Sequence, residues 1–260
     1  SAGDGGATPQ WNVAGNWVGG AAPANPTTAT VTFTTNNTPL YSELEADRAI
    51  GVLASGTAGV TAAGDSRNTV LDLKGHTLSI GTTLGSISGN QYARNTFVFT
   101  NGTVRVGTAA KAANITLGAG TTLRFASDTV LDGVNIDTLT VGVSGYIATY
   151  LDLRDVIVTG GTLAMNKLTV AAGSSRAGRI YLGGNSDLEN LHVRGAMALA
   201  EGGGNTGYVS YIGDPANTFT FGGQAYGLFP SGVSLTLGNA PSSRGTAYIA
   251  CNNSAQAYCA

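Results

Sequence analysis

The chain has 260 residues, a formal net charge of −2 and only 11% charged residues, against about 25% in ordinary globular domains. Its length allows one or two domains, and a hydrophobic fraction of 42% suffices for a core. The sequence contains no basic run, which argues against nucleic-acid binding, and no apolar window of about 18 residues, which argues against a transmembrane helix.

Residues 1–66 are expected to form an N-terminal cap followed by the first strands. Trp11 and Trp17 are the two tryptophans of the chain, and large apolar rings of this kind can cover the open end of a repetitive stack. The alternating segment that ends near Phe33 predicts a strand, and residues 40–50 predict a short cap segment or a pair of strands. The alternative for the three aromatic residues is a platform that binds a sugar ring.

The most informative stretch is residues 68–81, NTVLDLKGHTLSIG. Leu71 and Leu73 precede a Lys-Gly-His turn, and Leu78 and Ile80 follow it, with the alternation typical of half-buried strands. Glycine in such turns adopts conformations with positive φ at little cost. Similar phrases of strand, turn and strand recur at 97–106, 115–125, 150–158 and 233–237.

Residues 67–260 therefore predict a run of coils in a right-handed parallel β-helix, an all-β solenoid that forms one continuous domain. The strand spacing fits coils of about 18–27 residues, in the range where repeats indicate solenoids. Proline is scarce after residue 39, with Pro215, Pro230 and Pro241 remaining, as hydrogen-bonded central strands require. Many short strands also fit a β-sandwich, which is the alternative fold.

Two of these segments resemble the autotransporter-associated β-strand repeat proteins. The pattern W-x-x-x-G-N-W at residues 11–17, followed by T-V-x-F at residues 30–33, is similar to the opening of that family, and residues 68–80 resemble its T-L-D-L-x-G-x-T-L-x-I repeat. The resemblance covers the first third of the chain directly. It implies a secreted bacterial protein with a right-handed parallel β-helix and a role as an adhesin or surface protein.

The two cysteines, Cys251 and Cys259, lie close together near the C-terminus. A disulfide that closes the terminal loop is the preferred interpretation, and two free thiols in a reducing compartment are the alternative. The low charge, the expected disulfide and a start at Ser1, which is compatible with a mature form after signal removal, predict a secreted or cell-surface protein.

A polysaccharide lyase or hydrolase site is the sharpest catalytic hypothesis that the sequence offers. Asp152 and Asp155 would hold Ca²⁺ while Arg154 abstracts a proton beside a uronate, or the two aspartates would be a glycosidase pair, whose carboxyl groups lie about 5–9.5 Å apart. The favoured interpretation is that these aspartates form turns, with no catalytic and no metal site. The densest set of such residues is Arg124, Asp128, Asp132, Asp137, Asp152, Arg154 and Asp155.

The last third of the chain is rich in aromatic residues, including Tyr208 and Tyr211, which predict a carbohydrate- or partner-binding surface or a wide terminal coil. We predict an extracellular structural protein of a bacterial surface or matrix that acts by self-assembly into fibres or by adhesion. The expected partner is the protein itself, end to end, or a cell-surface polysaccharide, and the only cofactor considered is calcium for a lyase. The alternatives are a polysaccharide lyase or hydrolase and a non-catalytic carbohydrate-binding module.

Overall fold

The fold is described from a computed structural model, which covers most of the chain up to residue 199 and single strands beyond it. The described residues are 10–35, 40–57, 66–85, 94–118, 120–143, 148–172, 178–183, 186–188, 190–194, 196–199, 206–212, 220–221, 234–237 and 244–247. Statements about side chains are confined to residues up to 194.

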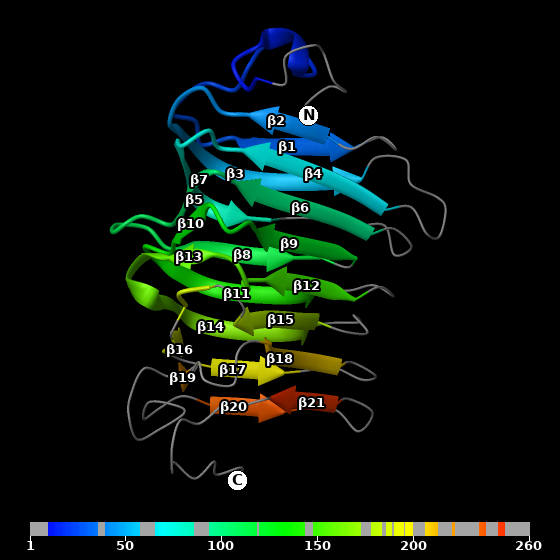
Figure 1. The fold of residues 1–260 in the computed structure, drawn as a ribbon, viewed down its shortest axis with the longest axis vertical. Helices are drawn as coiled ribbons and strands as arrows, with labels where there is room; N and C mark the ends of the chain where they lie inside the picture. Colours follow the sequence, from blue (N-terminus) through cyan, green and yellow to red (C-terminus); the bar gives the residue numbers. More distant parts are fainter. Residues whose placement is uncertain are drawn as a thin grey trace.

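Two sheets run side by side along the whole stack (Figure 1). The described part of the chain forms an 8-stranded sheet of β2 (Leu40–Glu43), β4 (Ser66–Asp72), β6 (Arg94–Thr100), β9 (Thr121–Phe125), β12 (Thr149–Asp152), β15 (Gly178–Gly183), β18 (Thr206–Ile212) and β21 (Arg244–Ala247).

The second sheet has 13 strands among the described residues. They are β1 (Thr30–Thr35), β3 (Arg48–Thr57), β5 (Thr77–Leu84), β7 (Gly102–Val106), β8 (Ala113–Leu117), β10 (Thr129–Asp132), β11 (Ile136–Val143), β13 (Ile157–Val158), β14 (Thr162–Ala172), β16 (Asn190–Val193), β17 (Ala196–Leu199), β19 (Thr220–Phe221) and β20 (Ser234–Leu237). Two short 3₁₀ helices, η1 (Ala14–Asn16) and η2 (Thr159–Gly161), complete the described elements.

Each strand of the 8-stranded sheet pairs in parallel with its counterpart in the next coil. The prediction of a parallel β-solenoid is therefore confirmed, and the alternative of a β-sandwich, whose sheets are antiparallel, is wrong. One column of register partners on the outer face consists of Tyr41, Val70, Val98, Arg124, Asp152 and Tyr181, whose numbers differ by 26 to 29.

Most coils are slightly longer than the predicted range of about 18–27 residues, since four of the five spacings in this column are 28 or 29 residues. The reason is visible in the 13-stranded sheet, where the long strand β5 pairs with β7 over its first half and with β8 at its end. From that point on, most coils contribute two strands to this sheet and one to the other. The last described coil is longer still, because Tyr208 of β18 pairs with Thr246 of β21.

The core lies between the two sheets and follows the alternation read from the sequence. Residues 71, 73, 78 and 80, which the sequence places on one face, are each fully buried. The turn between them lies at Lys74 and Gly75, with φ values of 50° and 81°, and His76 N donates to Leu73 O at 2.8 Å. A neighbouring inner column passes through the buried Thr69 and continues in the next coils through Phe97, Leu123, Leu151 and Ile180.

Residues 40–43 and 48–50 lie in two strands joined by a short bend, so this segment is a pair of strands and not an irregular cap. β2 begins at Leu40 and joins the 8-stranded sheet through β4. β3 begins at Arg48 and lies between β1 and β5 in the other sheet. This part of the chain therefore forms a coil like those that follow it.

Candidate functional site

Trp11, Trp17 and Phe33 meet at the N-terminal end of the core. The Trp11 and Trp17 rings lie 5.1 Å apart edge to face, and each also meets the Phe33 ring edge to face, at 5.5 and 5.9 Å. Trp17 Nε1 donates a hydrogen bond to Trp11 O at 2.6 Å. Phe33 continues this cluster into the coils by packing on Phe97 at 5.8 Å.

All three side chains are buried, with exposed fractions of 1% for Trp11, 7% for Trp17 and 0% for Phe33. A sugar platform needs an aromatic face open to solvent, whereas these three rings pack edge to face against one another. Burying three aromatic rings at the first coil instead keeps water from the open end of the core.

The candidate residues Asp152 and Arg154 form a two-point ion pair on the outer side of β12. Arg154 Nε donates to Asp152 Oδ1 at 2.8 Å, and Arg154 Nη2 donates to Oδ2 at 2.6 Å. Burial alone would raise the pKa of Asp152, but the hydrogen bonds from Arg154 outweigh it and hold the pKa below the usual value of a carboxyl group. The same hydrogen bonds raise the pKa of Arg154. Both groups are therefore charged over a wide pH range.

Asp155, the third candidate, pairs with a neighbouring coil instead. Arg124 Nη2, on β9, donates to Asp155 Oδ2 at 3.0 Å. In both ion pairs the carboxylate lies beneath the guanidinium: the exposed fractions are 22% for Asp155 under 48% for Arg124, and 7% for Asp152 under 38% for Arg154. The layer that faces solvent at this site is therefore rich in N–H donors.

Two tyrosines complete this site, and sequence reasoning did not assign them to it. The rings of Tyr150 on β12 and Tyr181 on β15 are stacked 5.7 Å apart and nearly parallel, at 5°. The Arg154 guanidinium lies 4.9 Å from the centre of the Tyr181 ring, and that of Arg179 lies 5.6 Å from it. Arg179 Nη1 also donates to Tyr181 Oη at 3.1 Å. The coil register of the structure aligns Tyr150 with Arg179 and Asp152 with Tyr181, and no feature of the sequence marks this register.

Lyase chemistry finds little support in this geometry. A general base works best with a pKa near the operating pH, whereas the bond to Asp152 moves the pKa of Arg154 upward, away from that range. Within the described ranges, no three His, Cys, Asp or Glu side chains come together in a way that could hold a metal ion.

The other aspartates of the predicted set lie apart and bind neighbouring coils. Asp128 accepts hydrogen bonds from Thr100 Oγ1 at 2.9 and 3.0 Å. Arg105 Nε donates to Asp132 Oδ2 at 2.8 Å. The Asp137 carboxylate accepts from Asn166 Nδ2 at 3.0 Å. These side chains join one coil to the next.

A second polar cluster lies near the N-terminal end of the same outer face. Lys74 Nζ lies 3.0 Å from Glu43 Oε1 and 3.2 Å from Asp72 Oδ2, and Tyr41 Oη donates to Asp72 Oδ2 at 2.7 Å. Burial and the hydrogen bonds to the two carboxylates raise the pKa of Tyr41. This cluster carries one cation against two carboxylates.

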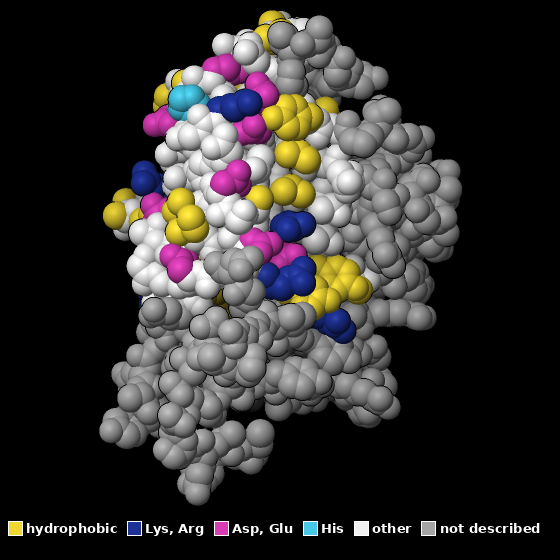
Figure 2. Space-filling view, viewed as in Figure 1, with side chains coloured by type: hydrophobic (Ala, Val, Ile, Leu, Met, Phe, Trp, Pro, Cys, Tyr) yellow, Lys and Arg dark blue, Asp and Glu magenta, His cyan; other side chains and the backbone are white. Residues whose placement is uncertain are grey.

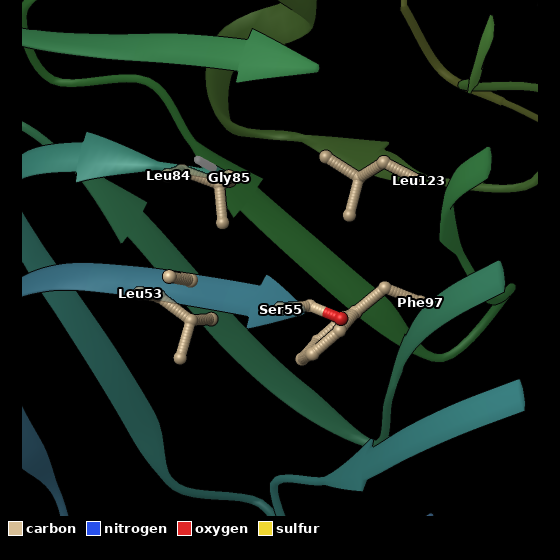
Figure 3. A pocket seen from close by; sticks show the side chains of 7 residues that line it. Leu53, Ser55, Leu84, Gly85, Phe97 and Leu123 are labelled. Atoms are coloured by element: carbon tan, nitrogen blue, oxygen red, sulfur yellow. The ribbon is translucent and has the colours of Figure 1, made fainter. Parts of the chain in front are cut away.

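A small cavity lies in the core between β3, β5, β6 and β9 (Figure 3). Its volume is about 10 Å³, and it is lined mainly by Leu53, Leu84, Phe97 and Leu123, with Ser55 as its polar residue. Asn95 Nδ2 donates to Ser55 Oγ at 2.7 Å. Small-molecule sites usually measure about 300–1,000 Å³, so this cavity is a packing defect of the core.

Two further predictions concern residues that are described only in part or not at all. Tyr208 and Tyr211 lie on β18, but their side chains are outside the described part of the structure. Cys251 and Cys259 are outside it altogether. The disulfide and the aromatic C-terminal surface therefore stay predictions.

Comparison with protein-family models, with curated proteins and with solved structures finds no match for this chain. The resemblance to the autotransporter-associated repeat proteins thus stays a prediction from the sequence. No helix in the described ranges has the length and apolar character needed to cross a membrane.

Proposed function

We propose that this protein is an extracellular structural protein of a bacterial surface or matrix that acts by adhesion through the flank of its stack. The observation that carries the proposal is the parallel ladder of the 8-stranded sheet, in which each coil from β2 to β15 places a side chain in the same outward column. Such a ladder presents side chains at fixed spacing along a rigid body. Binding by repeated contacts, without chemical change, is the function that this arrangement supports best.

Adhesion is better supported than end-to-end assembly. Assembly through the N-terminal end needs an open core there, and Trp11 and Trp17 cover the core beside Phe33. Capped ends are the usual means by which stacked strands avoid recruiting another chain. The flank, in contrast, exposes charged and hydrophobic side chains over several coils (Figure 2).

The rival function is a polysaccharide lyase that uses Asp152, Arg154 and Asp155. The ion pairs of these residues argue against it, because each charged group already has its partner within the protein. A hydrolase with the two aspartates is disfavoured for the same reason, since the acid of such a pair needs a raised pKa and that of Asp152 is lowered.

The proposal is tested with beads that carry the purified chain. We expect these beads to stay on immobilised bacterial envelopes after washing, while beads coated with albumin are removed. Light scattering over a concentration series should give a constant molecular mass. A molecular mass that grows with concentration would favour self-assembly over adhesion. Release of unsaturated uronate products from an acidic polysaccharide with calcium, abolished by Arg154→Gln, would overturn the proposal in favour of a lyase.

A further inference from the structure

We propose that Tyr150 and Tyr181 form a cross-linking site, at which one-electron oxidation joins the two rings into dityrosine. The oxidant is a peroxide used by a haem peroxidase, a class of enzyme that takes single electrons from phenols. The product is a covalent bond between two neighbouring coils. This modification goes beyond the proposed adhesive function and does not depend on it.

The two rings already lie against each other. Tyr150 on β12 and Tyr181 on β15 are stacked with 5.7 Å between the ring centres and 5° between the ring planes. The two strands are neighbours in the 8-stranded sheet (Figure 1), and the register aligns Tyr181 with Asp152, two residues beyond Tyr150. Aromatic side chains are long enough to meet across such a diagonal. Because groups that are held together react far faster than free ones, coupling within this pair is favoured over coupling between molecules.

Both rings can be reached from solvent. Tyr150 and Tyr181 are each half-buried on the outer side of their sheet, whereas the aromatic rings in contact inside the core belong to tryptophan and phenylalanine, which have no phenol. Among the described side chains, the remaining tyrosine is Tyr41, which has no ring contact with another tyrosine there and donates its hydroxyl to Asp72. The stacked pair is therefore the place in the described structure where two tyrosyl radicals can meet.

The arginines beside Tyr181 favour a neutral radical. Arg179 Nη1 donates to Tyr181 Oη at 3.1 Å, and the Arg154 guanidinium lies 4.9 Å from the ring centre. Two nearby cations disfavour a positive charge on the ring, so the phenol loses its proton together with the electron. A guanidinium accepts no proton, and the proton leaves to water. The oxygen of the resulting phenoxyl radical keeps accepting the hydrogen bond from Arg179.

The reaction balances with the peroxide as its one co-reactant. Each phenol gives up one electron and its O–H proton. A carbon–carbon bond then forms between the ortho positions of the two rings, and the hydrogen on each of these carbons moves to the phenol oxygen of its ring as aromaticity returns. The pair has lost two hydrogen atoms in total. One hydrogen peroxide has taken up two electrons and two protons and has become two waters.

The experiment treats the full chain, at low protein concentration, with hydrogen peroxide and a catalytic amount of a haem peroxidase. Cleavage after lysine and arginine gives the peptides 125–154, which carries Tyr150, and 180–194, which carries Tyr181. We expect mass spectrometry to find these peptides joined and lighter than their sum by two hydrogen atoms, with the blue fluorescence of dityrosine. Fragment ions assign the bond to Tyr150, because the first peptide also contains Tyr146.

Tyr150→Phe and Tyr181→Phe are the matched variants, since phenylalanine keeps the ring contact but has no phenol to oxidise. Each should abolish the joined peptides. Tyr41→Phe is the control for a tyrosine outside the pair, because Tyr41 is 42% exposed and equally open to the oxidant. This variant should leave the yield of the joined peptides unchanged. Circular dichroism confirms that each variant is folded.

The cross-link should also change the stability of the treated protein. A covalent bond between distant residues restricts the unfolded chain, so the urea midpoint of the oxidised wild type should rise. The rise should persist in a thiol reductant, which distinguishes it from the effect of a disulfide. Oxidised Tyr150→Phe should show no such rise.

Three results would overturn the inference: no joined peptides under conditions that couple a free tyrosine derivative, joined peptides that persist in Tyr181→Phe, or a yield that rises with protein concentration. The last result would mean that the tyrosines couple between molecules. The test of adhesion uses untreated protein, so failure of the cross-link leaves the adhesive function in place. Loss of adhesion likewise leaves the cross-link in place.

Discussion

Arg154 holds both carboxylate oxygens of Asp152, whose side chain is 7% exposed, in a two-point ion pair. Arg154→Gln removes the cation and leaves a buried carboxylate. Because Arg154 itself is 38% exposed, water offsets part of the loss, and we expect a destabilisation of about 1–2 kcal/mol. Urea unfolding measures it, and Arg105→Gln, in an exposed pair, should cost less than about 1 kcal/mol.

The same pair predicts a pH dependence of stability. The pKa of Asp152 is lower in the folded state than its usual value, which is about 3.9 in an unfolded chain. Its contribution to stability is therefore complete above that value and is lost as the pH falls through the folded pKa. Wild type and Asp152→Asn should thus converge in unfolding midpoint as the pH is lowered below about 4. A constant difference between them at every acidic pH would contradict this assignment.

Two buried threonines on neighbouring coils give opposite predictions for one substitution. Thr121 and Thr149 are both fully buried. Thr149 Oγ1 donates to Gly118 O at 2.8 Å, whereas Thr121 Oγ1 has no hydrogen-bond partner among the described residues. Thr121→Val should stabilise the protein by about 1 kcal/mol and Thr149→Val should destabilise it by about 1 kcal/mol. Unfolding midpoints that shift in the same direction for both variants would refute the difference.

Gly107 occupies a bend where a side chain has no room. Its φ is +80°, and an added Cβ would lie 2.1 Å from Asn135 O. Gly75 has a similar φ of +81° but no atom within 4 Å of the same position. Gly75→Ala should therefore cost only the backbone strain of about 1–2 kcal/mol, and Gly107→Ala clearly more. Thermal unfolding of the pair separates steric exclusion from backbone strain.

The aromatic cap can be tested by removing one ring. Trp17→Ala deletes a side chain that packs on Trp11 and Phe33 and should cost about 3–5 kcal/mol. Val18, the next residue, is 77% exposed, so Val18→Ala should change stability by less than about 0.5 kcal/mol. Gel filtration of the Trp17 variant should show association, since the core end is then open. A monomer that unfolds like the wild type would show that this end does not need its cap.

The stack of short strands could be predicted because the pattern that indicates it lies within short stretches of the sequence. Leu71 and Leu73 before a turn, with Leu78 and Ile80 after it, fix the inward face of two strands by alternation alone. The coil length was underestimated because it depends on bends such as that at Gly107, which divide one long strand into two. Nothing in the strand pattern marks where a coil closes.

The candidate site was predictable only in part, because some of its contacts are local in sequence and others depend on how the coils align. Asp152, Arg154 and Asp155 are near neighbours in sequence, so their proximity needed no register. The contact of Tyr150 with Tyr181, and of Arg124 with Asp155, depends on which residues align between coils. A register error of one residue moves a side chain to the opposite face, so these contacts required the structure.

The direction of the ladder has a mechanical consequence. Hydrogen bonds between coils lie roughly along the long axis of the stack (Figure 1), so a force that pulls its two ends apart stretches them along their own direction. Under such a force the hydrogen bonds break at one coil interface at a time. If the strands were instead pulled along their own length, many hydrogen bonds would have to break together. Each freed coil of 26 to 29 residues releases about 90–100 Å of chain, and the protein extends in steps under tension.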